Sequence, residues 1–285
     1  MFDLHLHTCC SDGSDSPNEV LQKAERLGLS VISITDHDNC DAYESLDMGL
    51  FSGKIVTGIE MQAYFKGLSI ELLGYGYNIT QMQSLIKGLH LPFEVINKAE
   101  LQRLYARCRA LGVKFASDTI KHFSSSGYFY ATEYLHHEMR NDIKNKVLVP
   151  DEESWEQGSV FFRRHVSNPQ SPFYIDESDL IPSVGRVADT IHQCGGKVFI
   201  PHIYQYDAKA DRLLRELVSQ YSIDGVECFY PSFTDAQTGF LLDFCQKNRL
   251  LVSGGSDYHG TNRSNTIGVL SCGGSCFHAN ASAFA

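Results

Sequence analysis

The sequence predicts an α/β protein built on a parallel sheet, with an inserted, mainly helical domain. Two observations predict this class. Short apolar runs alternate with helical stretches toward both ends of the chain, which is typical of parallel sheets, open or closed into a barrel. The middle of the chain is rich in helical patterns and has no convincing buried strand. At 285 residues, the chain is long enough to bury one large core and a smaller inserted domain.

The first part of the expected sheet occupies residues 1–84. One helix is well marked, because Pro17 suits a first helical turn and Gly28 suits a C-terminal stop. We therefore expect a helix at residues 17–27. The apolar runs of this part predict strands at residues 2–5, 31–34, 55–60 and 70–74.

Residues 85–176 are interpreted as the helical insertion, with the role of a substrate cap. Its expected helices lie at residues 97–112, 131–146 and 152–165. The strand–helix rhythm resumes in the second part of the sheet, residues 177–285. The strands expected there lie at residues 197–200, 225–228 and 250–253.

The charge of the chain is acidic, with 34 Asp and Glu residues against 24 Lys and Arg and a net charge of −10. This balance argues against a nucleic-acid coat or a membrane-surface protein, so we expect no stable nucleic-acid complex. No apolar run approaches the roughly 18 residues that a membrane span needs, and the start lacks the basic residues of a secretory signal. We expect a cytoplasmic protein without membrane contact. Bound cations would still let an acidic enzyme act on phosphates.

The nine cysteines are odd in number and mostly isolated, which argues against a disulfide framework. Close pairs occur at Cys9-Cys10 and at Cys272 and Cys276. Neither pair has a matching partner pair of the zinc-ribbon type, so reduced structural thiols are favoured over soft-metal ligands.

Polar side chains fall at or just past the ends of the expected strands. A single histidine on an apolar strand is usually structural, but ligands of parallel strand–helix folds gather at the C-terminal strand ends. Burying so many charges together would cost several kcal/mol per unpaired charge unless cations were present. The residues in question are His5, His7, His37, Glu60, Glu71, His202, Glu227, Asp257 and His259.

The local patterns around these residues suit a metal centre. His5 and His7 alternate along a strand and therefore share one face. Asp12 follows in a turn and is able to return a carboxylate to the site, although a plain turn explains it equally well. Asp257 and His259 lie in a Gly-rich turn that lets the backbone approach closely. Imidazole with carboxylate, and no thiolate, favours Zn, Mn or Fe over soft copper.

Together these motifs resemble the PHP family (polymerase and histidinol phosphatase domains). The similar branch is that of stand-alone PHP phosphoesterases with a helical insertion, which act on nucleoside 3′,5′-bisphosphates or nucleotides. The resemblance implies a distorted (β/α)7 barrel with two or three divalent ions. The motifs that carry it are His5-Leu6-His7-Thr8, Ser11-Asp12-Gly13, Ile34-Thr35-Asp36-His37-Asp38, Gly58-Ile59-Glu60, Pro201-His202 and Gly255-Ser256-Asp257-Tyr258-His259-Gly260.

The resemblance also implies roles for individual residues. One ion would be held by His5, His7, Glu60 and Asp257, a second by Asp12, His37 and His259, and a third by Glu60, Glu71 and His202. Glu71 stands where the family commonly has a histidine, which favours Mn or Fe over Zn at that position. Asp36 and Glu227 would orient ligands, and the candidate catalytic residues are His202, His259 and Asp257.

Phosphate recognition is assigned to the insertion. Ser171 stands where similar proteins carry a basic residue that contacts substrate phosphate. Arg140, Arg163 and Arg164 are candidates to compensate, because the guanidinium fork suits phosphate oxygens. A solvated helix face is the simpler reading of Arg163-Arg164.

The sequence therefore predicts a metal-dependent phosphoric ester hydrolase that uses metal-activated water on a small phosphorylated substrate, with a nucleotide or nucleoside bisphosphate favoured. The oligomeric state is not predicted. Three alternatives stay open: an amidohydrolase-like enzyme, a histidinol-phosphate phosphatase or short-oligonucleotide exonuclease of the same family, and a non-catalytic metal-binding module.

Overall fold

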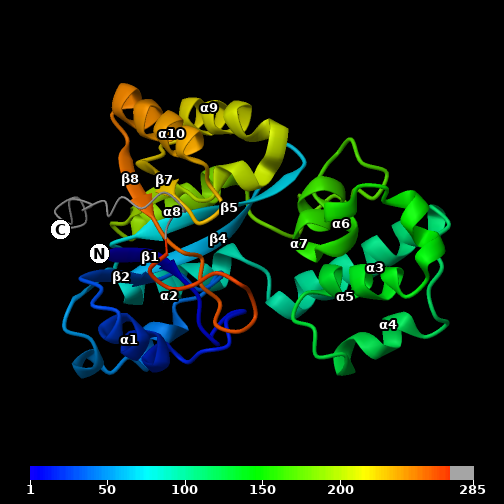
Figure 1. Cartoon of the computed structure of the whole chain (residues 1–285), viewed down its shortest axis with the longest axis horizontal. Helices are drawn as coiled ribbons and strands as arrows, with labels where there is room; N and C mark the ends of the chain where they lie inside the picture. The colour runs from blue at the N-terminus through cyan, green and yellow to red at the C-terminus, as the bar shows by residue number, and fades with distance from the viewer. Residues whose placement is uncertain (270–285) are drawn as a thin grey trace. The chain divides into compact units, whose positions relative to one another are not determined.

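The computed structural model describes residues 1–269 (Figure 1), so Cys272 and Cys276 lie outside the described residues. The chain divides into two compact units. Unit 1 holds Met1–Gln62, Glu71–Leu89 and the chain from Val184 onward, and unit 2 holds Ala63–Ile70 and His90–Ser183. Unit 2 therefore contains most of the insertion expected at residues 85–176, together with residues 63–70 and 177–183. Its role as a substrate cap stays a prediction.

The strands form two sheets. The first is wholly parallel and has the order β1 (Phe2–Leu6), β2 (Val31–Ile34), β3 (Lys54–Ile55). The second has five strands in the order β4 (Gly58–Phe65), β5 (Leu68–Tyr75), β6 (Lys197–Ile200), β7 (Gly225–Phe229), β8 (Leu251–Gly254). β6, β7 and β8 are parallel, whereas β5 runs antiparallel to β6.

The expectation of an all-parallel sheet is wrong at β5. Lys66 and Gly67 form a two-residue turn between β4 and β5, and both have positive φ, 51° and 90°. Such a turn makes a hairpin, whereas a parallel return needs a crossover of a dozen or more residues. The strand expected at residues 55–60 is also interrupted, because β3 ends at Ile55 and β4 begins at Gly58.

The predicted combination of helices and sheets is confirmed, as a mixed α/β fold, but no closed barrel of the expected (β/α)7 kind is found within residues 1–269. Isolated parallel bridges join the two sheets instead. Leu6 of β1 pairs with Tyr258, and His37, which follows β2, pairs with Glu60 of β4. The sheets are therefore linked where β1 and β2 end and β4 begins. The expectation that every candidate ligand lies at or past a strand end is wrong for Glu60, near the start of β4, and for Glu71, within β5, because the strands begin at other residues than the apolar runs indicate.

Helices cover the sheets of unit 1 (Figure 1). α1 (Pro17–Arg26) begins with a capping box between Ser16 and Glu19 and packs Val20 and Leu21 into one core cluster with Ile32 of β2. The other helices of this unit are α2 (Ile79–Leu89), α8 (Val184–Gln193), α9 (Ala210–Gln220) and α10 (Asp235–Asn248), with 3₁₀ turns η1 (Asp41–Glu44), η2 (Met48–Leu50) and η6 (Ile203–Lys209).

Unit 2 has a hydrophobic core of its own, which includes Leu104, Tyr134, Trp155 and Phe173. The helix expected at residues 152–165 is broken, because Gln157 is extended between two short helices. The helices of this unit are α3 (Phe93–Ala110), α4 (Thr119–His122), α5 (Ala131–Arg140), α6 (Glu152–Glu156) and α7 (Gly158–Phe161), with short turns η3 (Phe123–Ser125), η4 (Ile143–Leu148) and η5 (Phe162–Val166).

Within the described part of the chain, no helix is both long and apolar enough to span a membrane.

Candidate metal centre

The nine predicted ligands come together in unit 1 as three overlapping groups. Within each group, the potential ligand atoms all lie within 4.8 Å of one another. His7 belongs to the first and second groups, and Glu60 belongs to the second and third, so the groups form one continuous centre. The first group is His7, Asp12, His37 and His259; the second is His5, His7, Glu60 and Asp257; the third is Glu60, Glu71 and His202.

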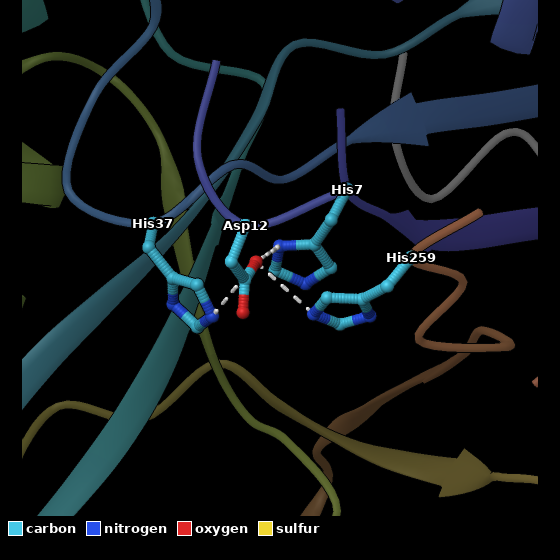
Figure 2. Close-up of side chains that lie close together, drawn as sticks. All are labelled: His7, Asp12, His37 and His259. Atoms are coloured by element: carbon cyan, nitrogen blue, oxygen red, sulfur yellow. Dashed lines mark ion pairs between the residues drawn. The ribbon is translucent and has the colours of Figure 1, made fainter. Parts of the chain in front are cut away.

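The first group surrounds one carboxylate oxygen. Asp12 Oδ1 lies 3.1 Å from His259 Nε2, 3.6 Å from His7 Nδ1 and 3.7 Å from His37 Nε2. Figure 2 shows this carboxylate among the three imidazoles. His37 is the most exposed of the four side chains, at 15%.

The second group is buried. Glu60 Oε2 lies 3.2 Å from His5 Nε2 and 3.3 Å from His7 Nε2. Asp257 Oδ1 approaches the same two nitrogens, at 3.4 and 3.3 Å. Two carboxylate oxygens and two imidazole nitrogens therefore converge on one small volume.

The third group extends the centre through the other oxygen of Glu60. His202 Nε2 lies 2.9 Å from Glu60 Oε1 and 3.7 Å from Glu71 Oε2. Glu71 also accepts a hydrogen bond from the hydroxyl of Tyr206 at 3.3 Å.

The donor set fits divalent cations. Both ring nitrogens of His7 and Nε2 of His259 are buried and have no hydrogen-bond partner among the described residues. Carboxylate oxygens nevertheless lie 3.1 to 3.6 Å from these atoms. Each buried polar atom without a hydrogen-bond partner costs about 1–3 kcal/mol of folding free energy. A cation bound between the nitrogens and the carboxylate oxygens would remove that cost, because it accepts the lone pairs of both.

The electrostatics of the centre favour ionised carboxylates. Burial alone raises the pKa of Glu60 and of Asp257, but the charges of nearby histidines, His5 among them, hold both values well below the usual range. Burial lowers the pKa of His7, yet the nearby carboxylates of Asp257 and Glu60 raise it to about 10. The site therefore attracts positive charge, and an ion that binds through His7 must displace a proton.

Glu227 and Asp36 hold ligand-bearing segments in place. Glu227 is fully buried, with Oε1 3.0 Å from His5 Nδ1, and its Oε2 accepts a 2.8 Å hydrogen bond from the backbone N–H of His202. Asp36 accepts from the backbone N–H and hydroxyl of Thr8 at 2.7 and 2.6 Å, and from the hydroxyl of Ser11 at 2.5 Å. The hydrogen bonds to Asp36 fix the loop that carries Asp12.

Two of the nine residues have strained backbones. Asp257 has φ of 53° and His202 has φ of 22°, in the left-handed region that favours glycine. The N–H of Asp257 donates to the carbonyl of His5 at 2.9 Å, which holds the turn against β1. Gly255 permits this approach, because a Cβ there would lie 2.1 Å from the Cβ of His5. Strain of this kind persists at functional sites when the surroundings enforce it.

Sequence reasoning missed several side chains that contact the ligands. Tyr230 donates a 2.8 Å hydrogen bond to Asp257 Oδ2, and Tyr206 contacts Glu71. Asp3 is buried on β1 and accepts from the backbone N–H groups of His5 at 3.3 Å and of Ser256 at 2.9 Å. Arg263 Nη2 donates to Asp12 Oδ2 at 3.0 Å.

The predicted phosphate-binding residues lie in unit 2 and in none of the three groups. Arg140 is paired with Glu156. Arg164 is paired with two acidic side chains of its own unit, at 2.9 and 2.7 Å. Ser171 is buried, with its hydroxyl 3.4 Å from His165 Nδ1. The roles of these residues, and of Arg163, stay predictions.

Known proteins resemble the chain over nearly its whole length. The model of the PHP domain matches residues 3–151. The chain is 24% identical to a 5′-3′ exoribonuclease of Haemophilus influenzae, covering 90% of this chain and 89% of the relative. It is 26% identical to the phosphoribosyl 1,2-cyclic phosphate 1,2-diphosphodiesterase of Eggerthella lenta, covering 90% and 94%. It is 23% identical to the 3′,5′-nucleoside bisphosphate phosphatase of Chromobacterium violaceum, covering 90% and 87%.

A solved structure supports the fold. The crystal structure of a putative metal-dependent phosphoesterase from Bifidobacterium adolescentis aligns with a TM-score of 0.58 at 23% identity, covering 94% of this chain and 90% of that one.

Proposed function

The chain belongs to the PHP family, and from this premise we propose that it is a metal-dependent phosphoesterase acting on a nucleotide or nucleoside bisphosphate. The observation that carries the proposal is the continuity of the three ligand groups through His7 and Glu60. A phosphoester anion repels a negatively charged nucleophile, and a cluster of cations offsets that repulsion.

The proposed centre holds two or three divalent ions. The second group would hold one, the first group another, and the third group a further one through its share of Glu60. Nitrogen and oxygen donors without sulfur favour Mn, Fe or Zn. The third group has two carboxylates and one imidazole, which favours Mn or Fe there.

When bound, such ions lower the pKa of water toward neutrality and neutralise phosphoryl oxygens. The protein's own residues set the geometry. His259 Nδ1 lies 2.8 Å from the carbonyl oxygen of Asp257, so its proton belongs there and Nε2 faces Asp12. This tautomer suits a ligand. His202 Nδ1 has no hydrogen-bond partner within the described chain, which leaves His202 as the candidate to protonate the leaving group.

The proposed substrate class rests on what the relatives share. Their names describe a 5′-3′ exoribonuclease, a phosphoribosyl cyclic phosphodiesterase and a nucleoside bisphosphate phosphatase. RNA, a phosphoribosyl compound and a nucleoside bisphosphate are all phosphoesters of a sugar. The net charge of −10 disfavours a long polyanion and favours a small molecule.

A second candidate is exonuclease action on short 5′-phosphorylated RNA. The 24% identity with the Haemophilus influenzae exoribonuclease over 90% of this chain favours it. The two candidates differ in the length of the substrate, so a graded set of substrates separates them.

A substrate panel with metal analysis tests the proposal. Metal-depleted protein is loaded with Mn, Fe or Zn and assayed on a nucleoside 3′,5′-bisphosphate, a nucleoside monophosphate, a phosphoribosyl cyclic phosphate, histidinol phosphate and a 5′-phosphorylated trinucleotide. Phosphate release from the bisphosphate, with bound metal, is the expected result. Metal binding without hydrolysis of any phosphoester would contradict the proposal and favour a non-catalytic module.

A matched pair of variants separates the site from general damage. Asp257→Asn should lose metal and turnover together, because Asp257 contributes to the buried group. Asp243→Asn changes an exposed carboxylate on α10 and should leave both unchanged.

A further inference from the structure

Arg263 lies in a short segment that is fastened to both ligand-bearing loops. The N–H of Thr261 donates to Ser14 Oγ at 2.8 Å, and the Asn262 side chain donates to the carbonyl of Asp12 at 2.8 Å. On the other side of Arg263, the Asn265 side chain donates to the carbonyl of Ser256 at 2.8 Å. These bonds fix the backbone on both sides of Arg263 beside the centre.

The guanidinium spans two candidate ligands. Nη2 lies 3.0 Å from Asp12 Oδ2, and Nη1 lies 3.6 Å from Asp257 Oδ2. The opposite oxygens, Oδ1 of both residues, face the imidazoles. Arg263 therefore lies along the outer edge of the centre, where the first and second groups meet.

Exposure places Arg263 between the buried centre and solvent. Its side chain is 33% exposed, against 7% for Asp12 and 4% for Asp257. Partly exposed ion pairs contribute only about 0–1 kcal/mol to stability. The contribution of these ion pairs to the stability of the fold is therefore too small to explain why an arginine lies at this edge.

We propose that Arg263 binds a phosphoryl oxygen of the substrate at the open edge of the metal centre. The inference rests on the proposed function and adds the residue that recognises the phosphoryl group. A guanidinium is always charged and presents a planar fork of N–H donors that matches phosphate oxygens. Arg140 and Arg164 are paired with carboxylates of unit 2, whereas Arg263 contacts the centre itself.

The test compares Arg263→Gln and Arg263→Lys with the wild type. Arg212→Gln is the matched control, because it also removes an arginine from a carboxylate pair, on the exposed face of α9. Metal content, Tm, KM for the preferred phosphoester and the binding of inorganic phosphate to metal-loaded protein are measured. We expect Arg263→Gln to keep its metal and to bind phosphate about 10- to 100-fold more weakly, with a matching rise in KM. Arg263→Lys should recover part of the loss, and Arg212→Gln should match the wild type.

Two results would overturn the inference. Unchanged phosphate binding in both Arg263 variants would remove Arg263 from recognition. Loss of metal in parallel with phosphate binding would reassign it to holding the two carboxylates. If wild-type protein hydrolyses no phosphoester, the proposed function fails. The phosphate-binding comparison still decides the role of Arg263 in that case.

Discussion

Replacing Glu227 with glutamine tests how the centre controls the proton on His5. Glu227 lies on β7 with Oε1 3.0 Å from His5 Nδ1, and Oε2 accepts from the N–H of His202 at 2.8 Å. An ionised carboxylate accepts at both oxygens, so it keeps the His5 proton on Nδ1. Nε2 is then left with a lone pair for an ion.

A glutamine of the same shape is unable to serve both partners. Its amide has one acceptor and one donor group, so either His202 loses its acceptor or His5 must carry its proton on Nε2. A lost hydrogen bond to a charged acceptor is worth about 1.5–3 kcal/mol. At 1.4 kcal/mol per factor of ten, we expect Glu227→Gln to weaken metal binding about 10- to 100-fold.

Competition with a coloured chelator measures the metal affinity of Glu227→Gln and of the wild type. Glu216→Gln on α9 is the control, because it removes a carboxylate that pairs with Arg212 away from the centre. Circular dichroism checks that the variants fold. Metal affinity within about twofold of wild type for Glu227→Gln would refute the reasoning about the proton on His5.

Three further predictions concern the same molecule. Tyr230→Phe removes the 2.8 Å bond to Asp257 and should weaken metal binding about 3- to 10-fold in the chelator assay; equal affinity would show that the bond does not orient the ligand. Burial raises the pKa of Glu100 to about 7 from 4.5, so the unfolded chain loses that proton first and stability falls as pH rises through this window. Glu100→Gln should therefore raise the unfolding free energy by about 2–3 kcal/mol at pH 8 and leave it unchanged at pH 4. Unfolding is followed by the fluorescence of Trp155, the single tryptophan, which lies in the core of unit 2. An equal effect at both pH values would contradict this prediction. Removing metal should lower the stability of unit 1, and returning an ion at about 100 times its Kd should restore roughly 2.7 kcal/mol, measured by the shift in Tm; an unchanged Tm would argue against binding to the folded state.

The arrangement of the candidate ligands was predictable because strand ends obey a simple rule. His5 lies in β1 and His7 directly follows that strand, and the bridge between Leu6 and Tyr258 brings the distant Asp257 to the same place. Asp12, for which a plain turn was an equal explanation, lies in the first group, 3.1 Å from His259. The family assigned on these motifs is confirmed by the domain match over residues 3–151.

Other features depend on tertiary contacts that no local pattern encodes. Tyr230 follows β7 and meets Asp257 only because two loops pack together, 27 residues apart in sequence. The β4–β5 hairpin was missed because Lys66-Gly67 is a weaker turn signal than Asn-Gly, and the strands pair as antiparallel neighbours once that turn forms.

The position of Glu60 explains why the carboxylate of Glu71 affects the third group only. Glu60 presents Oε2 to His5 and His7 and Oε1 to His202, so it ties the third group to the buried second group. Glu71 contributes to the third group alone, where its neighbour is Tyr206. A carboxylate at this position therefore sets the donor set of one outer group alone, because the second group keeps both imidazoles and both carboxylates. The third group, which holds Glu71, therefore lies at one end of the centre, whereas Arg263 contacts the first and second groups through Asp12 and Asp257.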